Sequence, residues 1–251
     1  PVLIAQVDTP GIAQRVACSG NFVAVADGTA GLAVIDITDP PSARIVHQLD
    51  LGGTAQAVTT AGALAFVGLS SGQVVTVDLL SGTVLESVNA GAAIHDLGLE
   101  GDVLFVLLNS QLRAYSFTDG TLQFLGNSDP PGFIAEGITG LRRLFVGGGY
   151  AYVTSYPGYD TYDVRNPAAM AHVGLALNHG PNSFKQIVLN GSGLGVAVVG
   201  VNPRSDGTHD VYLYDVSNPA VTTGFLTLLP TPGLARAVSL YNGLAYVADG
   251  E

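Results

Sequence analysis

Apolar residues occur along this chain in short runs of about five to eight residues, which Gly, Asn, Asp or Pro separate from one another. Phe22–Ala26 and Val103–Leu108 are typical runs, rich in the β-branched and aromatic residues that favour strands. The separating residues are those that form tight turns. The pattern predicts an all-β protein of many short strands. No run approaches the ~20 apolar residues that a helix needs to cross a bilayer.

The pattern of apolar runs repeats along the chain. The segment Ala13–Asp27 returns as Ala235–Asp249 and as Leu141–Val153, and weaker copies begin at Ala55, Ile94 and Phe184. One apolar position of each copy aligns with the others, at intervals of 39 to 51 residues: Val16, Val58, Leu97, Leu144, Ile187 and Val238. Blades of β-propellers repeat at this period, and the short runs exclude helical repeats of similar length.

Each repeat is predicted to form four strands. In the first repeat we expect them at Gln14–Cys18, Phe22–Ala26, Leu32–Ile37 and Ala43–Leu49. The turn before the fourth strand combines an acidic or amide residue with Pro, which favours a turn and cannot donate to a sheet. An Asp recurs at the end of the third strand, and we expect it to cap that turn through its backbone N–H groups: Asp36, Asp78, Asp163 and Asp215.

One four-stranded unit cannot bury both of its faces, whereas units stacked around an axis can. We therefore predict a β-propeller of four-stranded blades that occupies residues 1–251 as one domain, with about six repeats visible. The segment Pro1–Val7 resembles a fourth strand, and the chain stops after the second strand of its sixth repeat. We expect the chain to be a piece of a longer protein, and six blades, seven or more stay open.

Residues Gly20–Gly28 and Gly31–Pro40 resemble the LVIVD repeat of bacterial and archaeal surface proteins, and Ala245–Gly250 is a second close match. The first and sixth repeats match best. The third departs most, with Tyr115–Phe117 in place of the Ile-Asp-Ile pattern. The resemblance implies a β-propeller that is secreted or held at the cell surface. It brings no shared set of catalytic residues.

The chain is acidic, with a formal net charge of −11 and Lys185 as its one lysine. Such a surface repels the phosphates of nucleic acids and anionic membranes, so we expect neither nucleic-acid binding nor membrane insertion. Cys18 has no second cysteine with which to form an internal disulfide, and we expect it to be a small buried residue. Few thiols and almost no lysine fit an extracellular bacterial protein.

Polar residues stand two positions before each aligned apolar residue, near the start of the first strand. They are predicted to form a ring at the mouth of the propeller channel: Gln14, Gln56, His95, Arg142, Lys185 and Arg236. With Arg15 and Arg143, this window holds five of the nine Lys and Arg residues. Cations that converge in a narrow mouth favour an anion. Alternatively, these side chains only fill the channel or pair with a nearby carboxylate such as Asp96 or Glu136.

Loops of the fourth and fifth repeats are further candidates for a binding site. Tyr156 and Tyr159 are predicted in a loop where exposed rings can stack on a sugar or anchor a protein; the alternative is a plain turn with partly buried rings. Asp129–Gly140 is an insertion before the fourth repeat, and Asp206–Asp210 is a long polar loop in the fifth. The five histidines have no metal-ligand spacing, and the sequence indicates no metal or cofactor.

Two functions remain open at this point. The first is a non-catalytic extracellular or cell-surface module that binds a protein or a glycan at the channel mouth. The second is a hydrolase or lyase acting on an anionic glycan or a small anionic ligand, with the ring cations and Glu136 or His95 as participants. A bound anion in contact with Arg142, Lys185 and Arg236 would favour the second.

Overall fold

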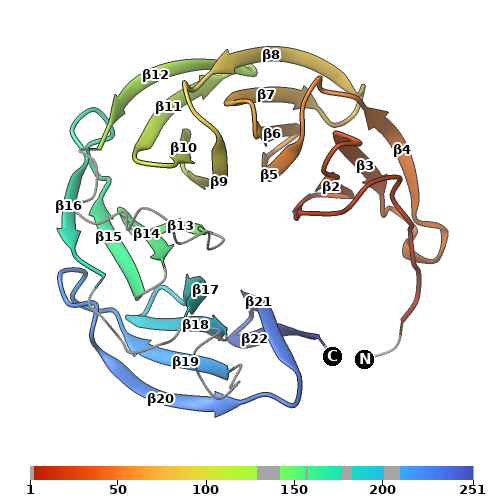
Figure 1. The fold of residues 1–251 in the computed structure, drawn as a ribbon. Coiled ribbons are helices and arrows are strands. Elements are labelled where there is room, and N and C mark those ends of the chain that lie inside the picture. Colours follow the sequence, from red (N-terminus) through yellow and green to blue (C-terminus); the bar gives the residue numbers. More distant parts are fainter. Residues whose placement is uncertain (1–2, 129–141, 156–157, 177–182, 201–209, 251) are drawn as a thin grey trace. The chain divides into compact units, whose positions relative to one another are not determined.

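The structure, a computed structural model, describes residues 3–128, 142–155, 158–176, 183–200 and 210–250. These residues form antiparallel sheets in which each strand pairs with the next along the chain (Figure 1). Within the described ranges, a single 3₁₀ turn at Pro40–Ser42 is the one helical element, and nothing there is a helix long and apolar enough to cross a membrane. The all-β prediction is confirmed.

The chain divides into two compact units, residues 1–125 and 126–251. The first unit contains three four-stranded sheets. They are β1 (Arg15–Ser19), β2 (Phe22–Ala26), β3 (Leu32–Asp36) and β4 (Arg44–Leu49); β5 (Ala55–Ala61), β6 (Leu64–Leu69), β7 (Gln73–Asp78) and β8 (Thr83–Asn89); and β9 (Ile94–Glu100), β10 (Val103–Leu108), β11 (Leu112–Thr118) and β12 (Thr121–Asn127). The predicted strands of the first repeat agree with β1–β4 to within a residue at each end.

The second unit contains two four-stranded sheets and one two-stranded sheet. They are β13 (Leu144–Gly147), β14 (Tyr150–Ser155), β15 (Gly158–Asp163) and β16 (Ala171–Gly174); β17 (Ser183–Leu189), β18 (Leu194–Gly200), β19 (Asp210–Asp215) and β20 (Phe225–Pro230); and β21 (Leu234–Tyr241) with β22 (Leu244–Gly250). We call β1, β5, β9, β13, β17 and β21 the first strands of their sheets.

The hydrophobic core lies between neighbouring sheets of a unit. Side chains alternate across a strand, so β7 sends Val75 and Val77 into the cluster shared with β1–β4. It sends Val74 into the cluster shared with β9–β12. In the second unit, an aromatic cluster around Tyr159 and Tyr214 joins β13–β16 to β17–β20. Strands with both faces buried explain why the apolar runs are continuous.

Four of the five third strands, β3, β7, β15 and β19, end on an Asp whose carboxylate accepts a hydrogen bond from a backbone N–H two or three residues later, whereas β11 ends on Thr118. The N–O distances are 2.9 Å from Thr38 to Asp36, 2.7 Å from Ser81 to Asp78, 3.1 Å from Arg165 to Asp163 and 3.0 Å from Ser217 to Asp215. The predicted turn caps are confirmed. Side-chain hydrogen bonds, which are the largest cause for Asp36, Asp163 and Asp215, and these backbone hydrogen bonds, the largest cause for Asp78, hold the pKa of all four carboxyl groups below the ordinary value of 3.8.

Two predictions about the amino-terminal region are wrong. Residues 3–7 form no strand. Instead, this segment is anchored a few residues later, where Asp27 accepts hydrogen bonds from the Thr9 hydroxyl at 2.7 Å and the Gly11 N–H at 2.8 Å. Cys18 is exposed rather than buried, because β1 alternates and Cys18 lies on the face opposite Ala17, which packs into the core.

Candidate functional site

Polar residues on the first strands were singled out from the sequence, and the structure shows what places them there. The first strands β5, β9, β17 and β21 each contain one extra residue relative to the strand they pair with. The extra residues are Gln56, His95, Lys185 and Arg236, respectively. A β-bulge of this kind turns a side chain out of the regular alternation, and bulges are common beside active sites. We call these four the bulge residues.

The other two predicted residues stand just ahead of their first strands. The Gln14 N–H donates to the Ala26 carbonyl oxygen at 2.8 Å, and Ala26 is the residue paired with Arg15. Arg142 precedes β13 and is partly buried. Burial lowers the pKa of the Arg142 guanidinium, and the charges of Asp160 and Tyr162 oppose that shift. The arrangement of all six residues in one ring involves both units and remains a prediction.

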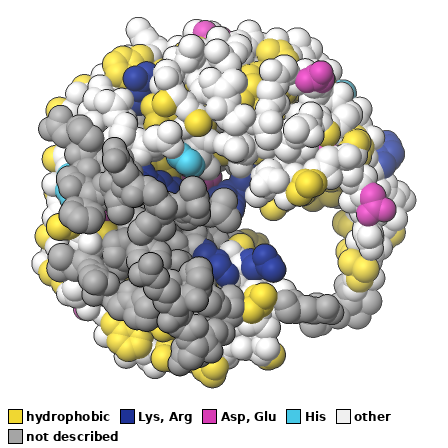
Figure 2. Space-filling model, in the orientation of Figure 1, with side chains coloured by type: hydrophobic (Ala, Val, Ile, Leu, Met, Phe, Trp, Pro, Cys, Tyr) yellow, Lys and Arg dark blue, Asp and Glu magenta, His cyan; other side chains and the backbone are white. Residues whose placement is uncertain are grey.

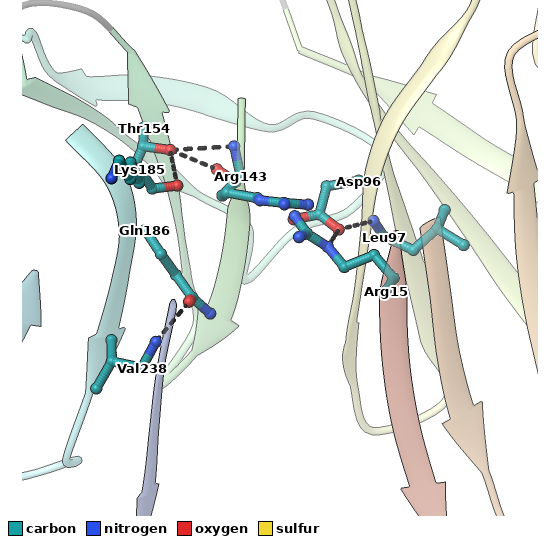
Figure 3. Close-up of polar contacts among 8 residues, drawn as sticks. All are labelled: Arg15, Asp96, Leu97, Arg143, Thr154, Lys185, Gln186 and Val238. Carbon is teal, nitrogen blue, oxygen red and sulfur yellow. Dashed lines mark hydrogen bonds and ion pairs between the residues drawn. The ribbon is translucent and has the colours of Figure 1, made fainter. Parts of the chain in front are cut away.

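In the first unit, the cation of this region is paired with a carboxylate. Arg15 and Asp96 form a two-pronged ion pair, with N–O distances of 3.3 Å and 3.1 Å (Figure 3). The side chains are 18% and 8% exposed, so the pair is largely shielded from water. Beside it, His95 hydrogen-bonds through Nε2 to the Asn109 side chain. Here the alternative reading, in which Arg15 pairs with Asp96, is the one observed.

In the second unit, two bulge residues come close together. The Lys185 Nζ donates to the carbonyl oxygen of Ala235, the residue before Arg236, at 2.8 Å. Burial lowers the pKa of the Lys185 ammonium, and the positive charge of Arg236 lowers it further. Figure 2 shows Lys and Arg side chains, in dark blue, at the surface near β17 and β21. The geometry suits an anion, because both groups donate hydrogen bonds and neither accepts one.

Neighbouring residues fix the backbone on which these two cations stand. The Val238 N–H donates to Gln186 Oε1 at 2.9 Å, which ties β21 to β17 (Figure 3). The fully buried Thr154 hydroxyl accepts from the Arg143 N–H at 3.0 Å and lies 3.4 Å from the Lys185 carbonyl oxygen. These contacts join three sheets of the unit, so the bulge residues stand on a well-supported framework.

A second polar cluster lies on β15, on β16 and just after β16, and nothing in the sequence pattern beyond the residue types predicts it. The 6% exposed Asp160 accepts hydrogen bonds from His172 Nε2 and from the Ala176 N–H, both at 3.0 Å. The His172 ring lies 5.0 Å from the Tyr162 ring, between centroids. Asp160 thus orients His172, whose side chain is 25% exposed.

Two residues of the predicted loop sites, Tyr159 and Asp210, lie in strands and are buried. Tyr159 belongs to strand β15 and is 1% exposed, so its assignment to an exposed loop is wrong; its ring fills the aromatic cluster instead. Asp210 begins β19 and is buried. Tyr156, the insertion at 129–140 and residues 206–209 lie outside the described residues. In the described ranges no three His, Cys, Asp or Glu side chains group as metal ligands would.

A shallow groove of about 240 Å³ is present at the other end of the strands of the second unit. Its lining includes Phe145, Tyr150, Tyr152 and the turn glycines Gly148 and Gly191. Arg165 stacks on the Tyr150 ring and pairs with Asp163. The groove is lined mainly by glycine and ring surfaces, whereas the bulge residues supply charge and hydrogen-bond donors.

Comparison with known proteins supports the repeat and the fold. A family model for the LVIVD repeat matches residues 10–50, 141–176 and 232–251. No curated protein sequence matches the chain. Solved structures match nearly all of it at low identity, which shows the fold alone. They include hydrazine synthase of Kuenenia stuttgartiensis (TM-score 0.73, 11% identity, 98% of this chain and 75% of that one).

Two further structures match comparably. The mitotic checkpoint complex contains a chain with a TM-score of 0.68 and 17% identity, over 92% of this chain and 69% of that one. The computationally designed protein Ika8 has a TM-score of 0.66 and 13% identity, over 97% of this chain and 70% of that one. With the repeated four-stranded sheets, these likenesses identify the fold as a β-propeller.

Proposed function

Because the chain is a β-propeller that carries LVIVD repeats, we propose that it is a non-catalytic interaction module of the cell surface or extracellular space. Its partner is a glycan or a protein, which binds at the face where the first strands begin. Propellers of one fold host many functions, so the proposal depends on the residues of this face and not on the fold.

The bulges of the first strands are the observation that carries this proposal. Four first strands have an extra residue at equivalent places, and each of these residues is polar. The Asp residues that end the third strands lie at the opposite end of the sheets and are engaged in turn caps. The bulge residues have no comparable role shared by all four.

An array of glycans and proteins tests the proposal. The intact chain should bind at least one arrayed partner, and a variant with Gln56, His95, Lys185 and Arg236 all changed to Ala should lose that binding. A control with Arg44→Ala and Arg165→Ala removes two exposed cations elsewhere and should bind normally. Binding that survives in the four-site variant, with the same far-ultraviolet circular dichroism as the intact chain, would contradict the proposal.

An enzyme acting on an anionic glycan is the second candidate, and the Asp160–His172 pair is what favours it. A carboxylate that orients a partly exposed histidine is an arrangement used in general acid–base catalysis. Incubation of each bound glycan with the chain distinguishes the two. Release of shortened products, lost in His172→Ala, would favour the enzyme; unchanged glycan favours the binding module.

A further inference from the structure

Two cations stand on neighbouring first strands of the second unit. Lys185 is the bulge residue of β17 and Arg236 is the bulge residue of β21, and these strands pack against each other. The Lys185 ammonium is held beside the Arg236 bulge by its 2.8 Å hydrogen bond to the Ala235 carbonyl oxygen. The sequence separates the two residues widely, and the fold brings them together.

The Arg236 guanidinium has space because residue 250 on the neighbouring strand is glycine. A Cβ atom at Gly250 would lie 2.9 Å from Arg236 Nε, closer than real contacts allow. The Arg236 side chain therefore passes close to the Gly250 backbone at its Cδ and Nε atoms. Arg236 itself is exposed, so a ligand can reach it.

These two like charges are close enough for Arg236 to lower the pKa of the Lys185 ammonium, and no carboxylate among the described residues pairs with either of them. Neither forms an ion pair there, whereas Arg15 in the first unit is paired with Asp96. The half-buried ammonium carries a lowered pKa, caused by burial and by the charge of Arg236. An anion bound to both groups would relieve their repulsion and accept hydrogen bonds from the donors of Lys185 and Arg236 that have no acceptor among the described residues.

We infer that Lys185 and Arg236 together bind an oxyanion group, a carboxylate or a sulfate, of an acidic glycan. This inference rests on the proposed function, because it specifies the ligand of the same face. A glycan fits better than a peptide, since the cores of protein interfaces are enriched in aromatic residues, Met and Arg, and Arg236 alone among the four bulge residues is of that kind.

Because the protein is acidic, binding of an acidic glycan must come from the cations at the site and not from the overall charge. With a net charge of −11, the chain as a whole repels an acidic polymer, so any affinity depends on a short-range cluster. A matched control is available. Lys185→Met with Arg236→Met and Arg44→Met with Arg165→Met remove the same charge, but the second pair comes from exposed positions that are ion-paired with Asp36 and Asp163.

Isothermal titration of the whole chain with four oligomers tests the inference. The probes are an oligogalacturonate, its methyl ester, a sulfated neutral oligosaccharide and an oligoglutamate. We expect the oligogalacturonate or the sulfated oligosaccharide to bind, and the one that binds identifies the source of the oxyanion. The Lys185→Met/Arg236→Met variant should weaken that binding about tenfold or more, since hydrogen bonds to charged groups contribute that much, and the control pair should not.

A positioning variant adds an independent readout. Gly250→Ala should weaken oxyanion binding by displacing the Arg236 guanidinium, with an unchanged melting temperature in the absence of ligand and partial recovery in Gly250→Ala with Arg236→Lys. Equal weakening by the control pair would reveal non-specific electrostatics and overturn the inference. So would failure of both acidic glycans to bind, or preference for oligoglutamate.

The outcomes separate the inference from the proposed function. Suppose that the methyl ester binds as tightly as the free acid and that the four-site alanine variant loses this binding. The inference of an oxyanion site would then be wrong, while the proposed glycan-binding function would stand. Failure of every arrayed glycan and protein to bind would remove the proposed function together with the inference.

Discussion

At the scale of single residues, Asp27 illustrates how the repeat holds its loops. Its carboxylate is fully buried and accepts hydrogen bonds from the Thr9 hydroxyl and the Gly11 N–H. The sixth repeat uses the same device, since the Gly233 N–H donates to Asp249 Oδ2 at 2.9 Å. A Cβ atom at Gly11 would lie 2.1 Å from the Asp27 carbonyl oxygen, so only glycine allows this approach.

We expect Asp27→Ala to lower the free energy of unfolding by roughly 2 kcal/mol, because it leaves the partly buried Gly11 N–H and Thr9 hydroxyl without an acceptor. Asp39→Ala, which removes an exposed contact with Ser42, is the matched control and should change stability by less than about 0.5 kcal/mol. Urea denaturation followed by circular dichroism measures both. Equal effects of the two substitutions would contradict the role of Asp27.

The capping carboxylates predict the acid side of the stability profile. Their pKa values are below 3.8 in the folded chain, so the folded state binds fewer protons there than the unfolded state. The stability they give is complete above the unfolded pKa and is lost as the pH falls through the lower, folded pKa. The melting temperature should therefore fall as the pH decreases below about 4.

A variant with Asn at all four positions isolates this contribution. Its melting temperature should fall less than that of the intact chain between about pH 5 and about pH 2, because four of the linked protons are absent. If the melting temperatures of the two proteins fall equally as the pH decreases, carboxylates other than these four govern acid unfolding.

At the scale of strands and sheets, the apolar runs predicted the existence of the strands and, in the first repeat, their bounds to within a residue. The alternation along β7 explains this success, since a strand buried on both faces reads as a continuous apolar run. The apolar runs do not show which face of a strand has no neighbouring sheet packed against it. Val16 on β1 is 63% exposed although the residue aligned with it on β5, Val58, is buried.

Phe66 tests the packing between sheets. It is fully buried on β6, and its ring centroid lies 4.8 Å from that of Phe117 on β11. Phe66→Ala should destabilise the fold by about 3–5 kcal/mol through lost burial and the cavity that remains. Phe124→Ala, at a 52% exposed position, should cost much less in the same thermal or urea unfolding measurement. Comparable losses would mean that the two sheets do not pack as described.

The Arg15–Asp96 pair links β1 to β9 within the first unit. A double-mutant cycle with Arg15→Met and Asp96→Asn should give a coupling energy of about 1–2 kcal/mol, because the pair is two-pronged and largely shielded from water. The cycle uses the free energies of unfolding of the four proteins. A coupling near zero would place the pair among ordinary surface contacts.

At the scale of the whole molecule, the repeat period and the turn chemistry predicted the β-propeller, since both reflect local sequence. The candidate site was predicted only in part. The positions two residues before the aligned apolar residues identified Lys185 and Arg236 as candidates. The bulges themselves were not predicted, because a bulge depends on how two strands pair and has no signature in the sequence of one strand. The ion pair of Arg15 and the burial of Tyr159 likewise depend on other repeats.

The central claim is that bulges on the first strands aim polar side chains at a ligand. A crystal structure of the chain with bound oligogalacturonate, or with the sulfated oligosaccharide if that is the one that binds, tests it most directly. We predict one extra residue at Gln56, His95, Lys185 and Arg236, with an oxyanion of the glycan in hydrogen-bond contact with Lys185 Nζ and the Arg236 guanidinium. Regular first strands, or a glycan bound away from both cations, would contradict the account.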